Sequence, residues 1–202
     1  MRVISVKGYK LVALLSLAGF FSGLITICAD YPVGPDLQLF LGIPLGVLIS
    51  ACLGRLRGKL NAWTAVKFII ATGNAYPLSG LLAGAIFLGG AVGGFLVLGS
   101  GMYLFESGMR WRAFKVAVFC SPLGGVLGLL GWALSTSLGM ALWSFAHALH
   151  LTAPTETFQN AAGQTSHSFA LIVVWETGMA FALGVLLWRY EAKPRGRELE
   201  QP

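Results

Sequence analysis

The sequence predicts an all-α, polytopic membrane helix bundle with six transmembrane helices and both termini on the cytoplasmic side. Of its 202 residues, 56% are hydrophobic and only 11% are charged, and the mean hydropathy is +0.75. Such a composition leaves too little polar surface to coat a water-soluble globule. A helix needs about 20 largely apolar residues to cross the hydrocarbon core. Six such helices with short connections therefore use most of the chain.

The basic residues predict the topology. All 14 of them fall into four groups: Arg2, Lys7 and Lys10; Arg55, Arg57, Lys59 and Lys67; Arg110, Arg112 and Lys115; Arg189, Lys193, Arg195 and Arg197. Loops rich in lysine and arginine stay on the cytoplasmic face of a membrane. Each group therefore marks a place where the chain is on that face. Between successive groups the chain must cross and return, which gives six crossings.

The predicted transmembrane domain covers residues 1–189 and is followed by a short cytoplasmic tail at residues 190–202. Its spans lie at about residues 10–29, 37–54, 67–88, 91–109, 113–135 and 168–188. The first span also resembles a signal peptide, because three basic residues precede it. Its apolar run is longer than that of a signal peptide, and no small-x-small cleavage site follows. We therefore expect an uncleaved first span, which ends in an acidic outer turn at residues 30–36.

The third and fourth spans share one apolar stretch at residues 62–105. The turn between them could lie at residues 77–80 or at Gly89–Gly90. The second position leaves Lys67 at the inner interface, where its ammonium group can reach the aqueous phase while its stem remains in lipid. We therefore expect the turn at Gly89–Gly90, with Pro77 inside the third span.

The fifth span is followed by a further apolar segment at residues 138–151. This segment is too short for another crossing and lies on the wrong side of the membrane for one, so it is expected to be an interfacial helix or an extension of the fifth span. Residues 153–167 are polar and predict the largest outer loop. The sixth span then closes at Arg189.

Glycine and proline predict how the helices pack. Glycine pairs four residues apart let helix backbones approach closely, and they occur at Gly19/Gly23, Gly42/Gly46, Gly80/Gly84, Gly90/Gly94 and Gly124/Gly128. Pro44, Pro77 and Pro122 are candidate helix interruptions. The fragments that begin at Pro77 and Pro122 resemble each other, and paired interruptions point to the binding sites of some transporters. Chance similarity in a chain rich in glycine and leucine is the stronger explanation.

Glu176 is the most informative single residue. It lies 13 residues before Arg189, which places it about 20 Å from the inner boundary of a core about 30 Å thick. A carboxylate at this depth is costly unless it is protonated or paired. The same count of depth selects Tyr76, Ser79 and Ser100 as polar neighbours. These four residues form the predicted substrate or proton site. The alternative is a permanently protonated Glu176 that only joins two helices.

Other chemistry has weaker support. His147 and His150 share a helix face, and His167 and Glu156 could add ligands, but this spacing is a weak metal signal and no metal or cofactor is expected. No nucleophile lies beside a base within the spans, so enzyme activity is the least supported class. The basic residues lie at span ends rather than in one patch, which argues against nucleic-acid binding.

Two functions remain as hypotheses. The first is a carrier of a small solute or ion, or the membrane subunit of a transporter, in which Glu176 exchanges a proton or contacts the substrate. The second is a non-catalytic membrane scaffold or assembly partner, in which glycine faces pack and Glu176 is a structural hydrogen-bond donor. In both, the lipid bilayer of a bacterial-type inner or plasma membrane is the main partner, with a membrane protein or a second copy of the chain as a further one.

Overall fold

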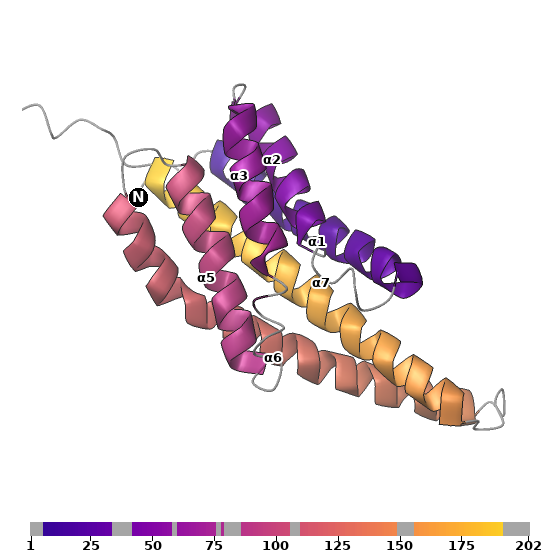
Figure 1. Cartoon of the computed structure of the whole chain (residues 1–202). Helices are drawn as coiled ribbons and strands as arrows, with labels where there is room; N and C mark the ends of the chain where they lie inside the picture. The colour runs from indigo at the N-terminus through magenta and orange to yellow at the C-terminus, as the bar shows by residue number, and fades with distance from the viewer. Residues whose placement is uncertain are drawn as a thin grey trace, which may run out of the picture.

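The computed structural model describes residues 6–33, 42–57, 60–75, 78, 86–105, 110–148 and 156–191 (Figure 1). These residues form six helices: α1 (Val6–Val33), α2 (Ile43–Arg57), α3 (Ala62–Gly73), α5 (Ile86–Phe105), α6 (Arg110–Ala148) and α7 (Glu156–Glu191). The described ranges contain no strand. The predicted all-α class is therefore confirmed for this part of the chain.

Four of the helices contain segments that are long and apolar enough to cross a membrane. These segments are Gly8–Thr26, Ile86–Phe105, Ala113–Ser135 and Leu171–Arg189, while α2 and α3 are apolar but shorter. Large apolar side chains also point outward, with Phe119 81% exposed and Trp111 65% exposed. A water-soluble bundle would bury such side chains, whereas lipid solvates them. These features indicate a membrane protein.

Helices that follow one another in the chain run antiparallel, and so do α1 and α7. Gly8 at the start of α1 lies against Trp188 near the end of α7, and Gly23 lies against Val173. The hairpin of α2 and α3 and the pair of α5 and α6 have the same antiparallel arrangement (Figure 1). The first residues of α1, α3 and α6 therefore lie at the same end of the bundle as the last residues of α2, α5 and α7. We call this the basic end.

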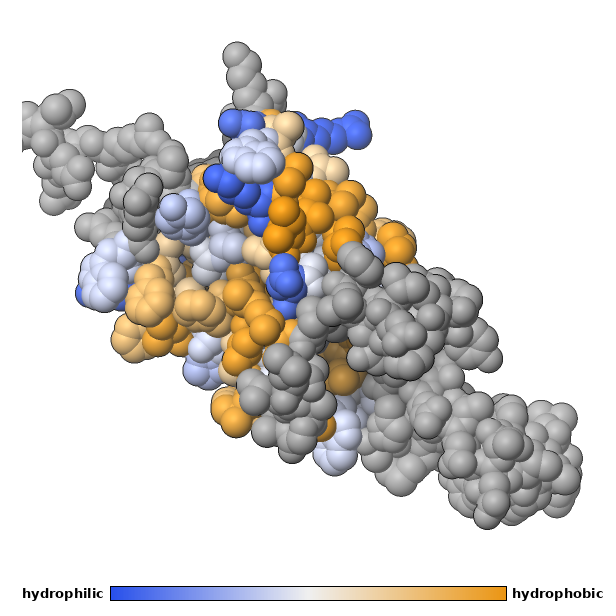
Figure 2. All heavy atoms as spheres, viewed as in Figure 1, coloured by the Kyte–Doolittle hydropathy of each residue, from blue (hydrophilic) through white to orange (hydrophobic). Residues whose placement is uncertain are grey.

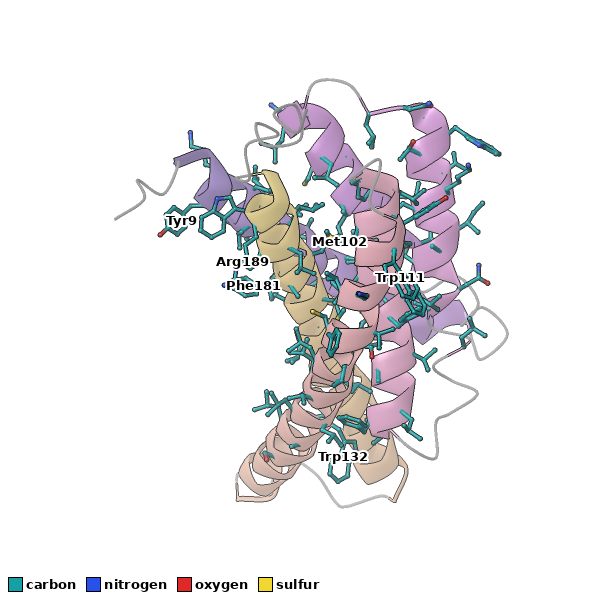
Figure 3. The ribbon with its side chains drawn as sticks, turned by 90° about the vertical axis from the view of Figure 1, so that its left-hand side faces the viewer. Tyr9, Met102, Trp111, Trp132, Phe181 and Arg189 are labelled. Atoms are coloured by element: carbon teal, nitrogen blue, oxygen red, sulfur yellow. The ribbon has the colours of Figure 1, made fainter. Side chains whose placement is uncertain are left out.

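The basic end carries the described cationic side chains. Lys10, Arg55, Lys67, Lys115 and Arg189 are all exposed and lie within six residues of this end of their helices. Figure 2 shows strongly hydrophilic residues concentrated toward the top of the view, above a largely apolar surface. Aromatic side chains gather there too. Tyr9 contacts Trp188 with ring centroids 5.8 Å apart, and Figure 3 shows Tyr9 and Arg189 near one another. Charge and amphipathic rings thus occupy the positions expected of a membrane interface.

The predicted turn at Gly89–Gly90 is wrong, because α5 continues through both residues. Helix α3 ends at Gly73, before α5 begins at Ile86. Packing explains the difference: a Cβ on Gly90 would lie 2.5 Å from the carbonyl oxygen of Gly124 on α6. The glycine is needed for close approach rather than for a turn. The other turn considered, residues 77–80, lies outside the described residues except for Leu78.

Helices α6 and α7 are longer than a bilayer requires. They contain 39 and 36 residues, which correspond to about 58 and 54 Å at 1.5 Å per residue. Figure 1 shows their distal parts extending together beyond the other helices. Of the two alternatives for residues 138–151, the extension of the fifth span is confirmed as far as Ala148. The outer loop predicted at residues 153–167 is wrong from Glu156 onward, where α7 begins.

The prolines differ in what they do. Pro44 lies in the first turn of α2, where a missing N–H removes no helical hydrogen bond, so it starts a helix rather than interrupting one. Pro122 lies inside α6, where it does remove such a bond. A proline at this position is an ordinary cause of helix bending, and Figure 1 shows α6 bent along its length. Pro77 lies outside the described residues.

Candidate functional site

The side chain of Glu176 lies in the core of the bundle. It is 0% exposed, as is Thr26 of α1. The hydroxyl of Thr26 donates a hydrogen bond to Oε1 of Glu176 across the boundary between α1 and α7, with the two oxygens 3.3 Å apart. Thr26 was not among the residues predicted for this site. A depth count could have found it, because Thr26 lies 16 residues after Lys10, or about 24 Å along the helix.

Two glycines bring α1 and α7 close enough for this contact. A Cβ on Gly19 would lie 2.5 Å from the backbone oxygen of Glu176, and one on Gly23 would lie 2.8 Å from Cα of Val173. A side chain at either position would force the two backbones apart. The predicted packing role of Gly19 and Gly23 is therefore confirmed. These glycines let the carboxyl of Glu176 on one helix lie beside the hydroxyl of Thr26 on the other.

A second hydroxyl of α1 lies on the same helix face. Ser22 precedes Thr26 by four residues, a spacing that places two side chains one above the other, and it is also 0% exposed. Within the described residues, Oγ of Ser22 is buried and has no hydrogen-bond partner. The same holds for Oγ1 of Thr177, which follows Glu176 on α7. We refer to Glu176, Thr26 and Ser22 as the Glu176 cluster.

The hydroxyl of Ser22 is one of three described hydroxyls, with those of Ser50 and Thr177, that are buried without a hydrogen-bond partner. Serine and threonine in helices commonly donate to a carbonyl three or four residues earlier. Several described hydroxyls do so: those of Ser16, Thr72, Ser100, Ser121 and Ser137. The hydroxyl of Ser22 makes no such bond. The cluster therefore holds a buried oxygen with hydrogen-bonding capacity to spare.

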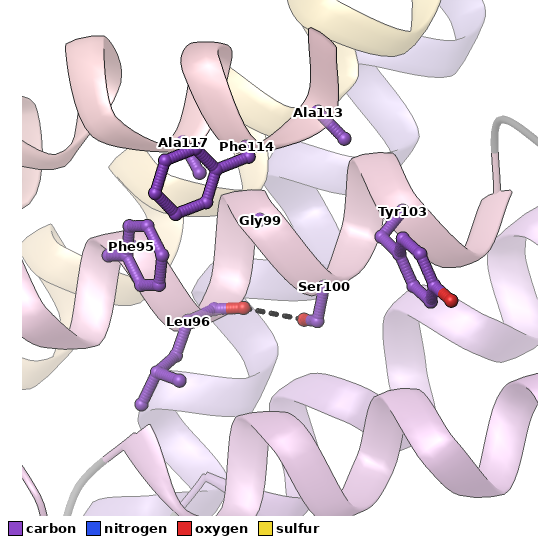
Figure 4. Close-up of a pocket in the computed structure, with 8 residues that line it drawn as sticks. All are labelled: Phe95, Leu96, Gly99, Ser100, Tyr103, Ala113, Phe114 and Ala117. Atoms are coloured by element: carbon purple, nitrogen blue, oxygen red, sulfur yellow. Dashed lines mark hydrogen bonds between the residues drawn. The ribbon is translucent and has the colours of Figure 1, made fainter. Parts of the chain in front are cut away.

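The other predicted members of the site are not seen beside Glu176. Tyr76 and Ser79 lie outside the described residues. Ser100 lies on α5, where its hydroxyl donates to the backbone oxygen of Leu96 at 2.5 Å. It lines a groove of about 320 Å³ between α5 and α6 (Figure 4). Aromatic residues, a leucine and small residues form the rest of that groove, and Glu176 is not among its lining residues. Ser100 thus belongs to a separate feature of the bundle.

The predicted histidine group falls largely outside what the structure describes. His147 lies in α6 and His167 in α7, but the positions of their side chains are not among the described ones, and His150 is outside the described residues. In the described part of the chain, no group of three or more histidine, cysteine, aspartate or glutamate residues could hold a metal ion.

No known family model matches this chain, and no curated protein or solved structure is detectably similar to it. The Glu176 cluster is therefore the basis for inferring what the protein does. A carboxyl and two hydroxyls offer oxygen ligands and a group that can take up or release one proton. They lie where two helices meet, and the carboxyl is closed to solvent in this conformation. This arrangement can hold a proton, a water molecule or a small cation.

Proposed function

We propose that the protein is a multi-pass membrane carrier of a small solute or ion, or the membrane subunit of such a transporter. Glu176 is its proton-exchanging or substrate-contacting group. The observation that carries the proposal is the fully buried Glu176 bonded to Thr26, with the hydroxyl of Ser22 unused on the same helix face. A buried hydroxyl without a partner costs about 1–3 kcal/mol. A cluster kept only for packing should not retain this cost, whereas a site that accepts a ligand needs free capacity.

The proposal includes six crossings with both termini on the cytoplasmic side of a bacterial-type inner or plasma membrane. The basic end supports it, because the described cations of five helices meet at that end and such residues are retained in the cytoplasm. Helices α2 and α3, with 15 and 12 residues, are the second and third crossings. They are shorter than a full span of about 20 residues.

Glu176→Gln tests the carrier. Glutamine keeps a carbonyl oxygen to accept from Thr26 but cannot titrate, so the fold should survive with a change in unfolding free energy within about 1 kcal/mol. In proteoliposomes with an enclosed pH-sensitive dye, we expect the variant to dissipate an imposed pH gradient at least about 10-fold more slowly than the wild type, an activation difference of about 1.4 kcal/mol.

The matched control is Glu156→Gln, the same change at the first residue of α7 and outside its apolar segment Leu171–Arg189. It should leave the flux unaltered. A folded Glu176→Gln protein with wild-type flux would remove Glu176 from the transport mechanism.

The scaffold or assembly partner remains the second candidate, because the boundary between α1 and α7 is packed through glycine backbone and Glu176 is closed to solvent. The extension of α6 and α7 beyond the other helices supports it too, since a partner or second copy could contact this pair outside the bilayer. In a scaffold, wild-type protein would carry no pH-driven flux, and Glu176→Gln would still copurify with the same partners from mild detergent.

A further inference from the structure

The distance between the two bonded oxygens of the Glu176 cluster is long for a hydrogen bond. Hydroxyl-to-oxygen bonds have donor–acceptor distances of about 2.5–3.0 Å, whereas Oγ1 of Thr26 and Oε1 of Glu176 are 3.3 Å apart. Around a hard cation with ligands at about 2.4 Å, two oxygens at right angles lie about 3.4 Å from each other. The observed separation therefore suits two neighbouring ligands of one cation.

Ser22 supplies a third oxygen. Its side chain shares a face of α1 with Thr26, is 0% exposed, and has no hydrogen-bond partner among the described residues. By contrast, the hydroxyl of Ser16 on the same helix donates a hydrogen bond to the backbone oxygen of Val12 at 2.8 Å. The unused lone pairs of Ser22 are what a ligand oxygen must offer.

The charge of these ligands selects the ion. One carboxylate and two neutral hydroxyls carry a single negative charge, which a monovalent cation neutralises. A divalent ion would leave a net positive charge in the core of the bundle, where uncompensated charge is costly. The ligands are all hard oxygen donors, with no sulfur or imidazole to favour a transition metal.

We propose that the Glu176 cluster binds a monovalent alkali cation, with sodium as the best fit, between α1 and α7. The carboxylate of Glu176 and the hydroxyls of Thr26 and Ser22 are ligands, and a proton competes with the ion for the carboxylate. This inference rests on the proposed carrier function, for which sodium would be the coupling ion.

Thermal unfolding of the purified full chain in mild detergent tests the site. Sodium chloride is titrated against choline chloride at constant ionic strength and pH 8. We expect a saturable rise in Tm, of about 5 °C near 100 times the dissociation constant. Potassium should stabilise less because its larger radius requires longer bonds. At pH 5 the rise should shrink, since protons occupy the carboxylate.

Ser22→Ala should raise the half-saturating sodium concentration at least about 10-fold, the effect of losing one ligand worth about 1.4 kcal/mol. Ser16→Ala is the matched control, because it deletes a hydroxyl of α1 that is already bonded to Val12, and it should respond like the wild type. Should Ser22→Ala fail to fold, Thr26→Val and binding of radioactive sodium to the wild type decide the question.

Absence of any sodium-specific rise in the wild type, or an equal rise in Ser22→Ala, would overturn the cation site and leave a water molecule or proton in the cluster. The two proposals fail separately. If Glu176→Gln loses flux but sodium does not stabilise the wild type, the carrier proposal stands and the sodium site is ruled out. If sodium stabilises the wild type but not Ser22→Ala, and Glu176→Gln keeps its flux, the sodium site stands and the carrier proposal is ruled out.

Discussion

Gly19→Ala is expected to lower the unfolding free energy by about 3 kcal/mol, the upper part of the range for overpacking a close contact. The added Cβ would lie 2.5 Å from the backbone oxygen of Glu176, 2.7 Å from Cβ of Ala180 and 2.9 Å from Cα of Thr177. None of these atoms can rotate away, because two belong to the backbone and the third is attached directly to it. The helices must separate, and the Glu176 cluster separates with them.

Gly54→Ala is the matched control. There the nearest atom to an added Cβ is Cβ of Leu60 at 3.7 Å, an ordinary contact. Alanine also favours a helix over glycine by up to about 1 kcal/mol, so this variant should be as stable as the wild type or more so. Both are compared by denaturant or thermal unfolding in the same detergent. An unaltered transition in Gly19→Ala would mean that α1 and α7 do not approach as described.

Local spacing predicted several of the packed glycines, though not Gly101 or Gly178, and it did not predict which helices they join. The pairs Gly19/Gly23 and Gly90/Gly94 were visible because four residues return to the same helix face. The partner of α1 was not visible, since α7 lies about 150 residues away in sequence and spacing within one helix carries no information about the other. The same limit explains why the turn was wrongly predicted at Gly89–Gly90. Glycine serves both turns and close contacts, and only α6 shows which use applies.

Depth was easier to predict than rotation about a helix axis. Counting residues from the basic groups placed Glu176 inside the bundle, where the structure buries it. Counting cannot tell which way a side chain faces, and Ser100 lines the groove between α5 and α6. Polarity alone also misled at residues 156–167. Glutamate, glutamine and alanine are good helix formers, and α7 packs against α6, with the amide of Leu171 donating to Oγ of Ser135 at 3.1 Å.

Accessibility labelling should give an all-or-none result for the proposed topology. In a background without the native cysteines, single cysteines replace Asp36, Gly58, Gly108 or Gln164. An impermeant thiol reagent applied to intact cells should label the first and last, while Gly58→Cys and Gly108→Cys should react only after permeabilisation. The reason is energetic: each lysine or arginine moved into the hydrocarbon centre costs about 2.5–3.5 kcal/mol, and several such residues flank Gly58 and Gly108.

Labelling of Gly58→Cys or Gly108→Cys from outside would mean that the basic end faces outward, which would contradict the proposed topology and every depth counted from that end. Permeabilised cells are the control for reactivity, because a buried thiol stays unlabelled in both conditions. The Asp36 site bears on the Glu176 cluster directly. The segment Gly8–Thr26 crosses only if Asp36 is outside, and only a crossing α1 places Thr26 and Ser22 deep in the membrane. With both termini inside, an inner Asp36 would mean that α1 does not cross, so Thr26 and Ser22 would not lie deep in the membrane, although the bundle itself still buries Glu176.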